Sequence, residues 1–191
     1  MEAFLVSTGI VALAEVADKT QLLALILAAK FHKPVPIILG IFVATVGNHA
    51  LAGGLGVSIS HFLSPEILKW IVGLSFICMG VWALIPDKAD DDNRMTKDAG
   101  IFVATVVAFF LAEMGDKTQV ATIALAARFD TFLPVVMGTT LGMLIANVPV
   151  VYFGDIVMKK APVKLIHTIV AIIFFILGGT AILAALGLIA V

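Results

Sequence analysis

The chain alternates long apolar runs with short polar breaks, and this pattern predicts six membrane-spanning helices. A helix needs about 20 apolar residues to cross the hydrocarbon core of a bilayer. Six runs meet that requirement: 3–30, 35–61, 66–85, 99–128, 132–157 and 163–190. Lysine, histidine and proline interrupt the pattern at 30–34, and lysine and proline interrupt it again at 159–162. We therefore expect an all-α integral membrane protein that folds as a single transmembrane domain.

The composition agrees with a lipid environment. Of the 191 residues, 61% are hydrophobic and 13% are charged, whereas soluble domains average roughly half apolar and a quarter charged. The net charge of −1 gives no reason to expect a nucleic-acid partner. Because Glu2 and the charges at 15–19 interrupt the first apolar run, we expect a span there rather than a cleaved signal peptide.

One polar segment, 86–98, is long enough to be a solvated linker, and it contains five aspartates and three basic residues. With six spans, the breaks at 30–33, 86–98 and 158–164 lie on one side and carry eight Lys or Arg, against two on the other side. The positive-inside rule places the basic side in the cytoplasm. We expect a plasma-membrane protein, in bacterial terms of the inner membrane, with a cytoplasmic acidic linker and both termini outside.

An internal repeat relates the two halves of the chain. The motif Glu-x-x-Asp-Lys-Thr-Gln begins at Glu15 and recurs, 98 residues later, at Glu113. The same offset relates Pro36 to Pro134 and further glycines and aromatic residues. Repeat one would cover 1–85 and repeat two 99–191. Because each repeat has three spans, the second would enter the membrane from the opposite side, which predicts an inverted-topology repeat, a plan common among transporters.

The duplicated motif places charged side chains near the middle of the first and fourth spans. An ionisable group at that depth costs about 2.5–3.5 kcal/mol on insertion scales, so it points to function or to strong pairing. On a continuous helix, Glu15 and Asp18 would share one face, and Glu113 and Asp116 of the second motif would likewise share one face. We therefore expect four carboxylates to meet at the midplane: Glu15, Asp18, Glu113 and Asp116. Secondary oxygens could come from four neighbours: Thr20, Gln21, Thr118 and Gln119.

The charges and donor types of the motif favour a hard divalent cation. Four ionised carboxylates and two lysines, Lys19 and Lys117, leave a charge of −4 + 2 = −2, which one such ion would neutralise, although protonation could do the same. Oxygen donors suit Mg²⁺, Ca²⁺ and Mn²⁺, and neither motif contains His or Cys. We expect the lysines to tune the charge of the site. A purely structural alternative pairs Glu15 with Lys19, and Glu113 with Lys117, at i,i+4.

Polar residues in the second and fifth spans give a weaker signal. Asn48, His49 and Asn147 lie at mid-membrane, and His49 corresponds to Asn147 at the repeat offset. Hydrogen bonds between packed helices are the commoner explanation. The alternative is that these side chains line the path of the ion.

The two motifs resemble those of a family of Ca²⁺/Mn²⁺ transporters found in Golgi, chloroplast and bacterial membranes. The family signature is Glu-x-Gly-Asp-Lys/Arg-Ser/Thr in both halves. The segment from Glu113 to Thr118 matches it fully, while the first copy has Ala17 in place of the usual glycine. The resemblance covers essentially the whole chain. It implies export or organellar loading of the cation, in exchange for protons, and its compact bacterial members favour Mn²⁺.

We therefore expect a secondary transporter that exports Mn²⁺, with Ca²⁺/H⁺ antiport as the nearest alternative and a passive cation channel as another. The transported ion and protons would be substrates, and no cofactor is expected; the oligomeric state stays open. Intramembrane aspartyl proteases also use paired acids in spans. Their Gly-x-Gly-Asp element is incomplete at Gly115-Asp116, so we expect no enzyme.

Overall fold

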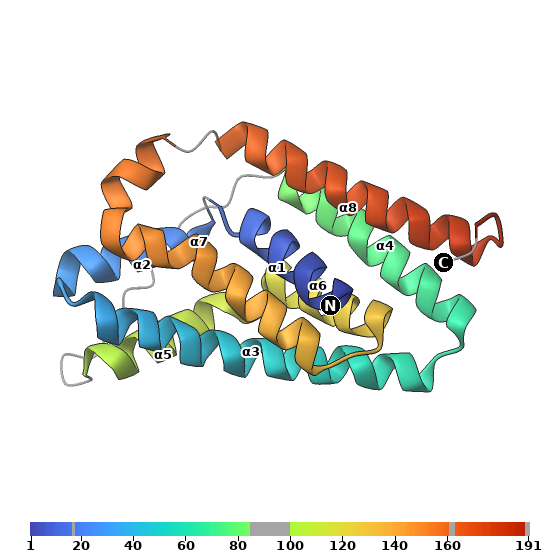
Figure 1. Ribbon diagram of the computed structural model, residues 1–191, viewed down its shortest axis with the longest axis horizontal. Coiled ribbons are helices and arrows are strands. Elements are labelled where there is room, and N and C mark those ends of the chain that lie inside the picture. Colours follow the sequence, from blue (N-terminus) through green and yellow to red (C-terminus); the bar gives the residue numbers. More distant parts are fainter. Residues whose placement is uncertain (17, 85–99, 161–162, 190–191) are drawn as a thin grey trace.

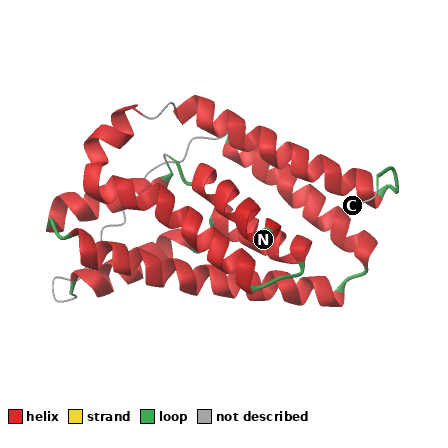
Figure 2. Cartoon of the chain, viewed as in Figure 1, coloured by secondary structure: helices red, strands yellow, loops and turns green. Residues whose placement is uncertain are grey.

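The computed structural model describes residues 1–16, 18–84, 100–160 and 163–189, and the acidic linker predicted at 86–98 lies outside them. All regular secondary structure in these described ranges is helical (Figure 2). The helices are α1 Glu2–Ala14, α2 Lys19–Phe31, α3 Pro34–Phe62, α4 Pro65–Ala83, α5 Ile101–Glu113, α6 Lys117–Phe129, α7 Leu133–Lys160 and α8 Val163–Ala185.

Four of the six predicted spans correspond to one helix each, α3, α4, α7 and α8, but α7 is kinked at Phe153, where the backbone is non-helical. The other two differ from the prediction, because the chain breaks in the middle of each. The first apolar run is divided into α1 and α2, and the fourth into α5 and α6, with 13 residues in every half-helix. The expectation that Glu15 and Asp18 share a face of one continuous helix is therefore wrong.

The local sequence explains why both helices stop at the motif. Asp18 and Asp116 are the N-cap residues of α2 and α6, with extended backbone angles of φ −79°, ψ 167° and φ −82°, ψ 166°. Aspartate is a favoured N-cap residue because its side chain can accept a hydrogen bond from the first turn, although neither aspartate makes that bond here. In the second motif Gly115 has φ +77°, a left-handed conformation that glycine adopts without a Cβ penalty. The corresponding Ala17 lies outside the described residues.

The two halves of the chain pack against each other in a reciprocal way. Helix α1 packs on α7 as α5 packs on α3, and α2 contacts α7 as α6 contacts α3. Corresponding helices run in opposite directions: α3 and α7 cross the molecule with opposite chain sense, as do α4 and α8 (Figure 1). The reciprocity is incomplete for the last helix of each repeat. Helix α4 packs on α6, but among the described residues its counterpart α8 has no comparable contact with α2. Likewise α8 packs on α1, but α4 has no comparable contact with α5.

Glycines allow the long helices to approach the half-helices closely. A Cβ at position 56 of α3 would lie 2.3 Å from the carbonyl oxygen of Ile123 in α6. A Cβ at position 142 of α7 would lie 2.7 Å from the carbonyl oxygen of Thr8 in α1. Small residues at helix contacts are typical of membrane proteins, where packing replaces the hydrophobic effect between helices.

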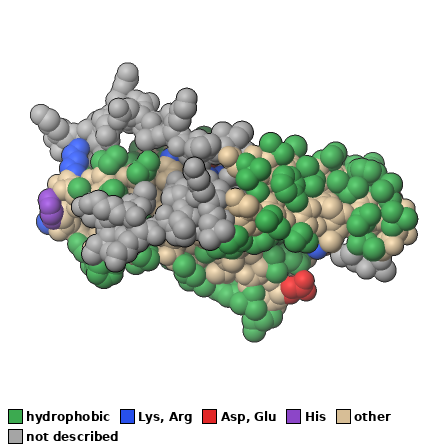
Figure 3. Space-filling view, turned by 90° about the horizontal axis from the view of Figure 1, so that it is seen from above, with side chains coloured by type: hydrophobic (Ala, Val, Ile, Leu, Met, Phe, Trp, Pro, Cys, Tyr) green, Lys and Arg blue, Asp and Glu red, His purple; other side chains and the backbone are tan. Residues whose placement is uncertain are grey.

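The outer surface is suited to lipid. Two of the described helical segments, Pro34–Phe62 and Leu133–Phe153, are long and apolar enough to cross a membrane. Each half-helix is too short to do so, since 13 residues rise only about 20 Å. Large apolar side chains such as Leu5, Leu51 and Leu141 are exposed, and hydrophobic side chains are abundant on the face drawn in Figure 3. This is the surface of a helical membrane protein.

Candidate metal-binding site

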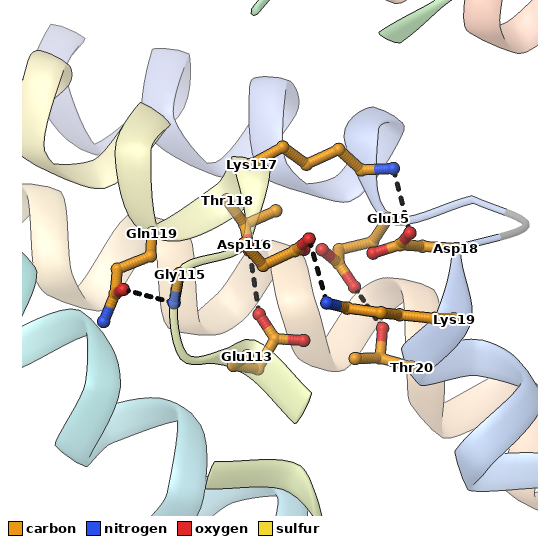
Figure 4. A network of polar contacts seen from close by, with 10 residues as sticks. All are labelled: Glu15, Asp18, Lys19, Thr20, Glu113, Gly115, Asp116, Lys117, Thr118 and Gln119. Carbon is orange, nitrogen blue, oxygen red and sulfur yellow. Dashed lines mark hydrogen bonds and ion pairs between the residues drawn. The ribbon is translucent and has the colours of Figure 1, made fainter. Parts of the chain in front are cut away.

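The broken helices bring the two motifs together in the interior of the protein. Glu15 caps the end of α1, Glu113 ends α5, and Asp116 begins α6. One carboxylate oxygen of each of these three residues lies within 4.8 Å of the others (Figure 4). The side chains are 0%, 0% and 2% exposed for Glu15, Glu113 and Asp116. Three acidic groups this close together and shielded from solvent repel one another unless protons or a cation neutralise them.

The fourth carboxylate, Asp18, is fully buried and pairs across the repeat. Lys117 Nζ lies 2.9 Å from Asp18 Oδ1, and Lys19 Nζ lies 3.2 Å from Asp116 Oδ1. Each lysine therefore pairs with the aspartate of the other motif (Figure 4). The alternative of i,i+4 pairs within each motif is not the pairing found. The break between the half-helices removes the helical spacing that such pairs require.

Two threonines orient the glutamates in the same way. The Thr20 hydroxyl donates to Glu15 Oε2 at 2.6 Å, and the Thr118 hydroxyl donates to Glu113 Oε2 at 2.8 Å. The other oxygen of each glutamate, Oε1, is buried and accepts no hydrogen bond from the described residues, and the same is true of Asp116 Oδ2. Buried polar atoms almost always have a partner. These three oxygens are therefore available to a ligand.

The helix ends add to the electrostatics of the site. The half-helices α1 and α5 end at the site, and α2 and α6 begin there, so each of the four helix dipoles has one end at the carboxylates. Partial negative charge at a helix C-terminus favours cations, while the N-termini stabilise Asp18 and Asp116 as anions. Broken helices that meet at the centre of a bundle are a known way of building ion sites inside membranes. Carboxylate and carbonyl oxygens suit Mg²⁺, Ca²⁺ and Mn²⁺.

The two glutamines, in contrast, occupy different positions in the two halves. The Gln21 amide Nε2 donates to the Ala146 carbonyl of α7 at 2.9 Å. Gln119 Oε1 accepts from the Gly115 N–H at 2.8 Å and points away from the carboxylates (Figure 4). The Gln119 side chain is thus anchored away from the acidic groups, whereas the Gln21 amide is anchored on α7.

The three polar residues that the sequence predicted at mid-membrane, Asn48, His49 and Asn147, are all buried. Asn48 Nδ2 donates to the Phe110 carbonyl of α5 at 3.0 Å, as expected for a packing contact between helices. Asn147 Nδ2 lies 3.1 Å from the Met143 carbonyl and 3.0 Å from its sulfur, both within α7. Neither ring nitrogen of His49 has a hydrogen-bond partner in the described part of the chain.

Sequence reasoning missed the helix break and what depends on it. The signal was present, since Asp followed by Lys-Thr is a helix N-cap pattern and Gly115 precedes Asp116. It was outweighed by the apolar residues on both sides, which continue the pattern of a single span. The crossed ion pairs carried no sequence signal, because they join residues far apart in the chain, 99 positions in the case of Lys117 and Asp18.

A helical bundle with lipid-facing apolar surface, broken helices and a buried carboxylate cluster defines a membrane protein of the cation-transport class. A sequence model of the family described as "Divalent cation/proton antiporter GDT1" matches residues 3–91 and 101–188. The chain therefore belongs to the GDT1 family of divalent cation/proton antiporters, which is a family of transporters and not of enzymes.

Individual relatives agree with this assignment. The chain is 51% identical over 179 residues to a protein of Vibrio cholerae serotype O1 named "Putative manganese exporter", covering 93% of this chain and 89% of the relative. It is 28% identical to GDT1-like protein sll0615 of a Synechocystis species, covering 92% and 94%. It is 21% identical to the divalent cation/proton antiporter GDT1 of Saccharomyces cerevisiae, covering 92% and 81%. No solved structure matches the chain.

Proposed function

We propose that this protein exports Mn²⁺ from the cytoplasm in exchange for protons, through a site formed by Glu15, Asp18, Glu113 and Asp116. The observation that supports this most directly is the trio of buried carboxylate oxygens, contributed by both motifs, that have no hydrogen-bond partner in the described part of the chain. A divalent ion would draw these oxygens together and neutralise their charge. The threonine hydroxyls support the site by orienting the glutamates. In the structure the amides of Gln21 and Gln119 are bonded to backbone groups. They would supply oxygens to the ion only in another conformation, with the side chains turned toward the carboxylates.

The exchange with protons follows from the chemistry of the ligands. Carboxylates must lose their protons before they coordinate a metal ion, so metal binding and protonation compete for the same groups. After releasing the metal ion, such a cluster can take up protons instead. The transporter can then return to its starting conformation without an uncompensated buried charge. The two lysines reduce the negative charge of the cluster, so that one divalent ion is enough to balance it.

For the transport cycle we propose six spans in two inverted repeats, with each pair of half-helices counted as one span. The opposite directions of corresponding helices support this arrangement, as does the reciprocal packing of α1 on α7 and α5 on α3. In such proteins, one repeat moves against the other around a fixed site. With the acidic linker in the cytoplasm, α2 and α5 lead from the site to the cytoplasmic side, and α1 and α6 to the outside of the plasma membrane.

Manganese is favoured as the substrate by the name of the Vibrio relative. Calcium is the second candidate, because all the donors of the cluster are oxygens and Ca²⁺ binds oxygen ligands. A passive channel would use the same ligands but would not couple the flux to protons.

The test is uptake of Mn²⁺ and Ca²⁺ into proteoliposomes, with and without an imposed pH gradient. We expect Mn²⁺ uptake driven by the gradient in the native protein and a loss of most uptake in the variant Asp116→Asn. The matched control is Asp130→Asn, since Asp130 is exposed and its left-handed backbone, with φ 48°, suits asparagine. Flux that ignores the pH gradient would show a channel. Native-like flux in Asp116→Asn would remove that residue from the site.

A further inference from the structure

Among the described residues, His49 is the side chain of the long helices that has two buried polar atoms without a hydrogen-bond partner. It lies in the middle of α3 and is 0% exposed, and neither Nδ1 nor Nε2 has a hydrogen-bond partner among the described residues. An unpaired polar group in an apolar environment costs about 1–3 kcal/mol by protein mutational data. A phenylalanine or leucine at this position would avoid that cost. The imidazole therefore requires a reason other than packing.

Contacts along α3 show where His49 lies relative to the carboxylates. Asn48 bonds the Phe110 carbonyl, three residues before Glu113. Further along α3, a Cβ at position 56 would touch the Ile123 carbonyl of α6. The break between α5 and α6, at 114–116, therefore faces the segment of α3 between these two contacts. His49 stands at the beginning of that segment, close to the level of Glu113.

The periodicity of the helix shows which way the imidazole faces. Positions 49 and 56 are seven residues apart and share nearly the same direction, and position 56 faces α6. Position 53, one turn after His49, faces α7, where a Cβ would meet Val136 at 2.7 Å. The imidazole is thus directed between α6 and α7, toward the interior that α3 encloses with the broken helices. Helix α7 in turn packs on α1 and α2, which carry the other motif.

The corresponding residue of the second repeat has a different donor. At the repeat offset His49 is replaced by Asn147, whose amide is anchored within α7 on Met143. One half of the protein therefore presents an imidazole nitrogen and the other half an amide. Ca²⁺ takes oxygen ligands in proteins. Mn²⁺ also prefers oxygen donors, but as a first-row transition ion it accepts a nitrogen donor more readily than Ca²⁺ does. His49 is not among the residues whose ligand atoms lie within 4.8 Å of one another, which are Glu15, Glu113 and Asp116. An imidazole that reaches the ion from this position would favour Mn²⁺ over Ca²⁺.

We propose that His49 supplies a nitrogen ligand to the ion as it passes the carboxylates, and that this contact selects Mn²⁺ over Ca²⁺. The inference rests on the proposed function, because it assumes that the ion crosses through the motif cluster. It goes beyond that function by assigning substrate choice to a residue outside both motifs. His49 acts in this scheme by direct contact with the ion, not through another side chain.

The experiment is competitive uptake of Mn²⁺ and Ca²⁺ by the purified protein in liposomes, comparing native protein with His49→Asn. Asparagine is the residue at the equivalent position of the other repeat, so the fold has a precedent for it. We expect the Mn²⁺/Ca²⁺ ratio to fall by at least about tenfold, a loss that even an outer-shell partner of a metal ligand typically causes. The control is His61→Asn, because His61 is also in α3 but its side chain is 67% exposed.

A spectroscopic measurement tests contact directly. Pulsed electron paramagnetic resonance of Mn²⁺ bound to the native protein should show coupling to an imidazole ¹⁴N nucleus, and the coupling should vanish in His49→Asn and persist in His61→Asn. Absence of ¹⁴N coupling in the native protein, or an unchanged transport ratio in His49→Asn, overturns the inference while leaving Mn²⁺ transport in place. If His49→Asn does not fold, the native spectrum alone decides. Failure of the native protein to move either ion overturns the proposed function itself.

Discussion

Lys117 Nζ lies 2.9 Å from Asp18 Oδ1, so the lysine of the second motif neutralises the aspartate of the first. The reciprocal pair, Lys19 with Asp116, is 3.2 Å long. The two contacts differ in exposure, since the lysine side chain is 6% exposed in the first pair and 24% in the second. The repeats are thus joined by two crossed ion pairs, of which the pair between Lys117 and Asp18 is the more deeply buried.

Replacing Lys117 with methionine should destabilise the protein more than replacing Lys19. Loss of one partner of a buried ion pair leaves an uncompensated charge and costs about 3–5 kcal/mol. Because the Lys19 side chain is partly exposed, solvent weakens its attraction to Asp116 in the native protein, and the loss of this pair costs less. Thermal unfolding of the variants Lys117→Met and Lys19→Met in the same detergent measures the difference. Equal losses, or the opposite order, would contradict it; Lys117→Arg keeps the charge and serves as the control.

The threonine hydroxyls should contribute to metal affinity more than to stability. A hydrogen bond to a charged group is worth about 1.5–3 kcal/mol, which is a factor of roughly ten to one hundred in affinity. We expect Thr20→Val and Thr118→Val each to weaken Mn²⁺ binding by about tenfold, measured by calorimetry. Thr180→Val is the matched control, because its hydroxyl bonds only a carbonyl of its own helix α8. Binding unchanged in both site variants would show that the glutamates need no orientation.

The backbone at Gly115 should resist substitution even though space is available. No atom lies within 4 Å of a Cβ built at this position, but its φ of +77° is unfavourable for other residues. We expect Gly115→Ala to lower the free energy of unfolding by about 1–2 kcal/mol. Gly179→Ala, in the interior of α8 and also without neighbours within 4 Å, should be neutral or stabilising because alanine has the higher helix propensity. A neutral Gly115→Ala would mean that the break relaxes to another conformation.

Metal binding should strengthen as the pH rises. Each carboxylate must be deprotonated to coordinate the ion, so Mn²⁺ binding releases protons and the dissociation constant falls with increasing pH. The dependence can be followed by Mn²⁺ titration of the purified protein in buffers of different pH, and by the protons released at each pH. The control Asp130→Asn should show the same slope, and the variant Glu113→Gln a shallower one. An affinity independent of pH would exclude proton exchange at this site.

The sequence was sufficient for the class of the protein and for its functional motif. Apolar runs predicted helices, of which α3, α4 and α8 are continuous as expected while α7 is kinked at Phe153. The cost of burying charge in a membrane singled out the two motifs. The resemblance to Ca²⁺/Mn²⁺ transporters is confirmed by the match to the GDT1 family. These inferences depend on composition and periodicity, which are properties of the chain itself.

The tertiary structure decided how the motif residues are arranged. Only the fold shows that Asp18 and Asp116 begin new helices, that each lysine crosses to the other repeat, and that Gln21 and Gln119 are anchored differently. It also shows that His49, for which the sequence left both a packing role and a place on the ion path open, has no hydrogen-bond partner among the described residues. The physical reason is that these features depend on contacts between residues far apart in the chain, whereas spacing in the sequence determines only which residues share a face of one uninterrupted helix.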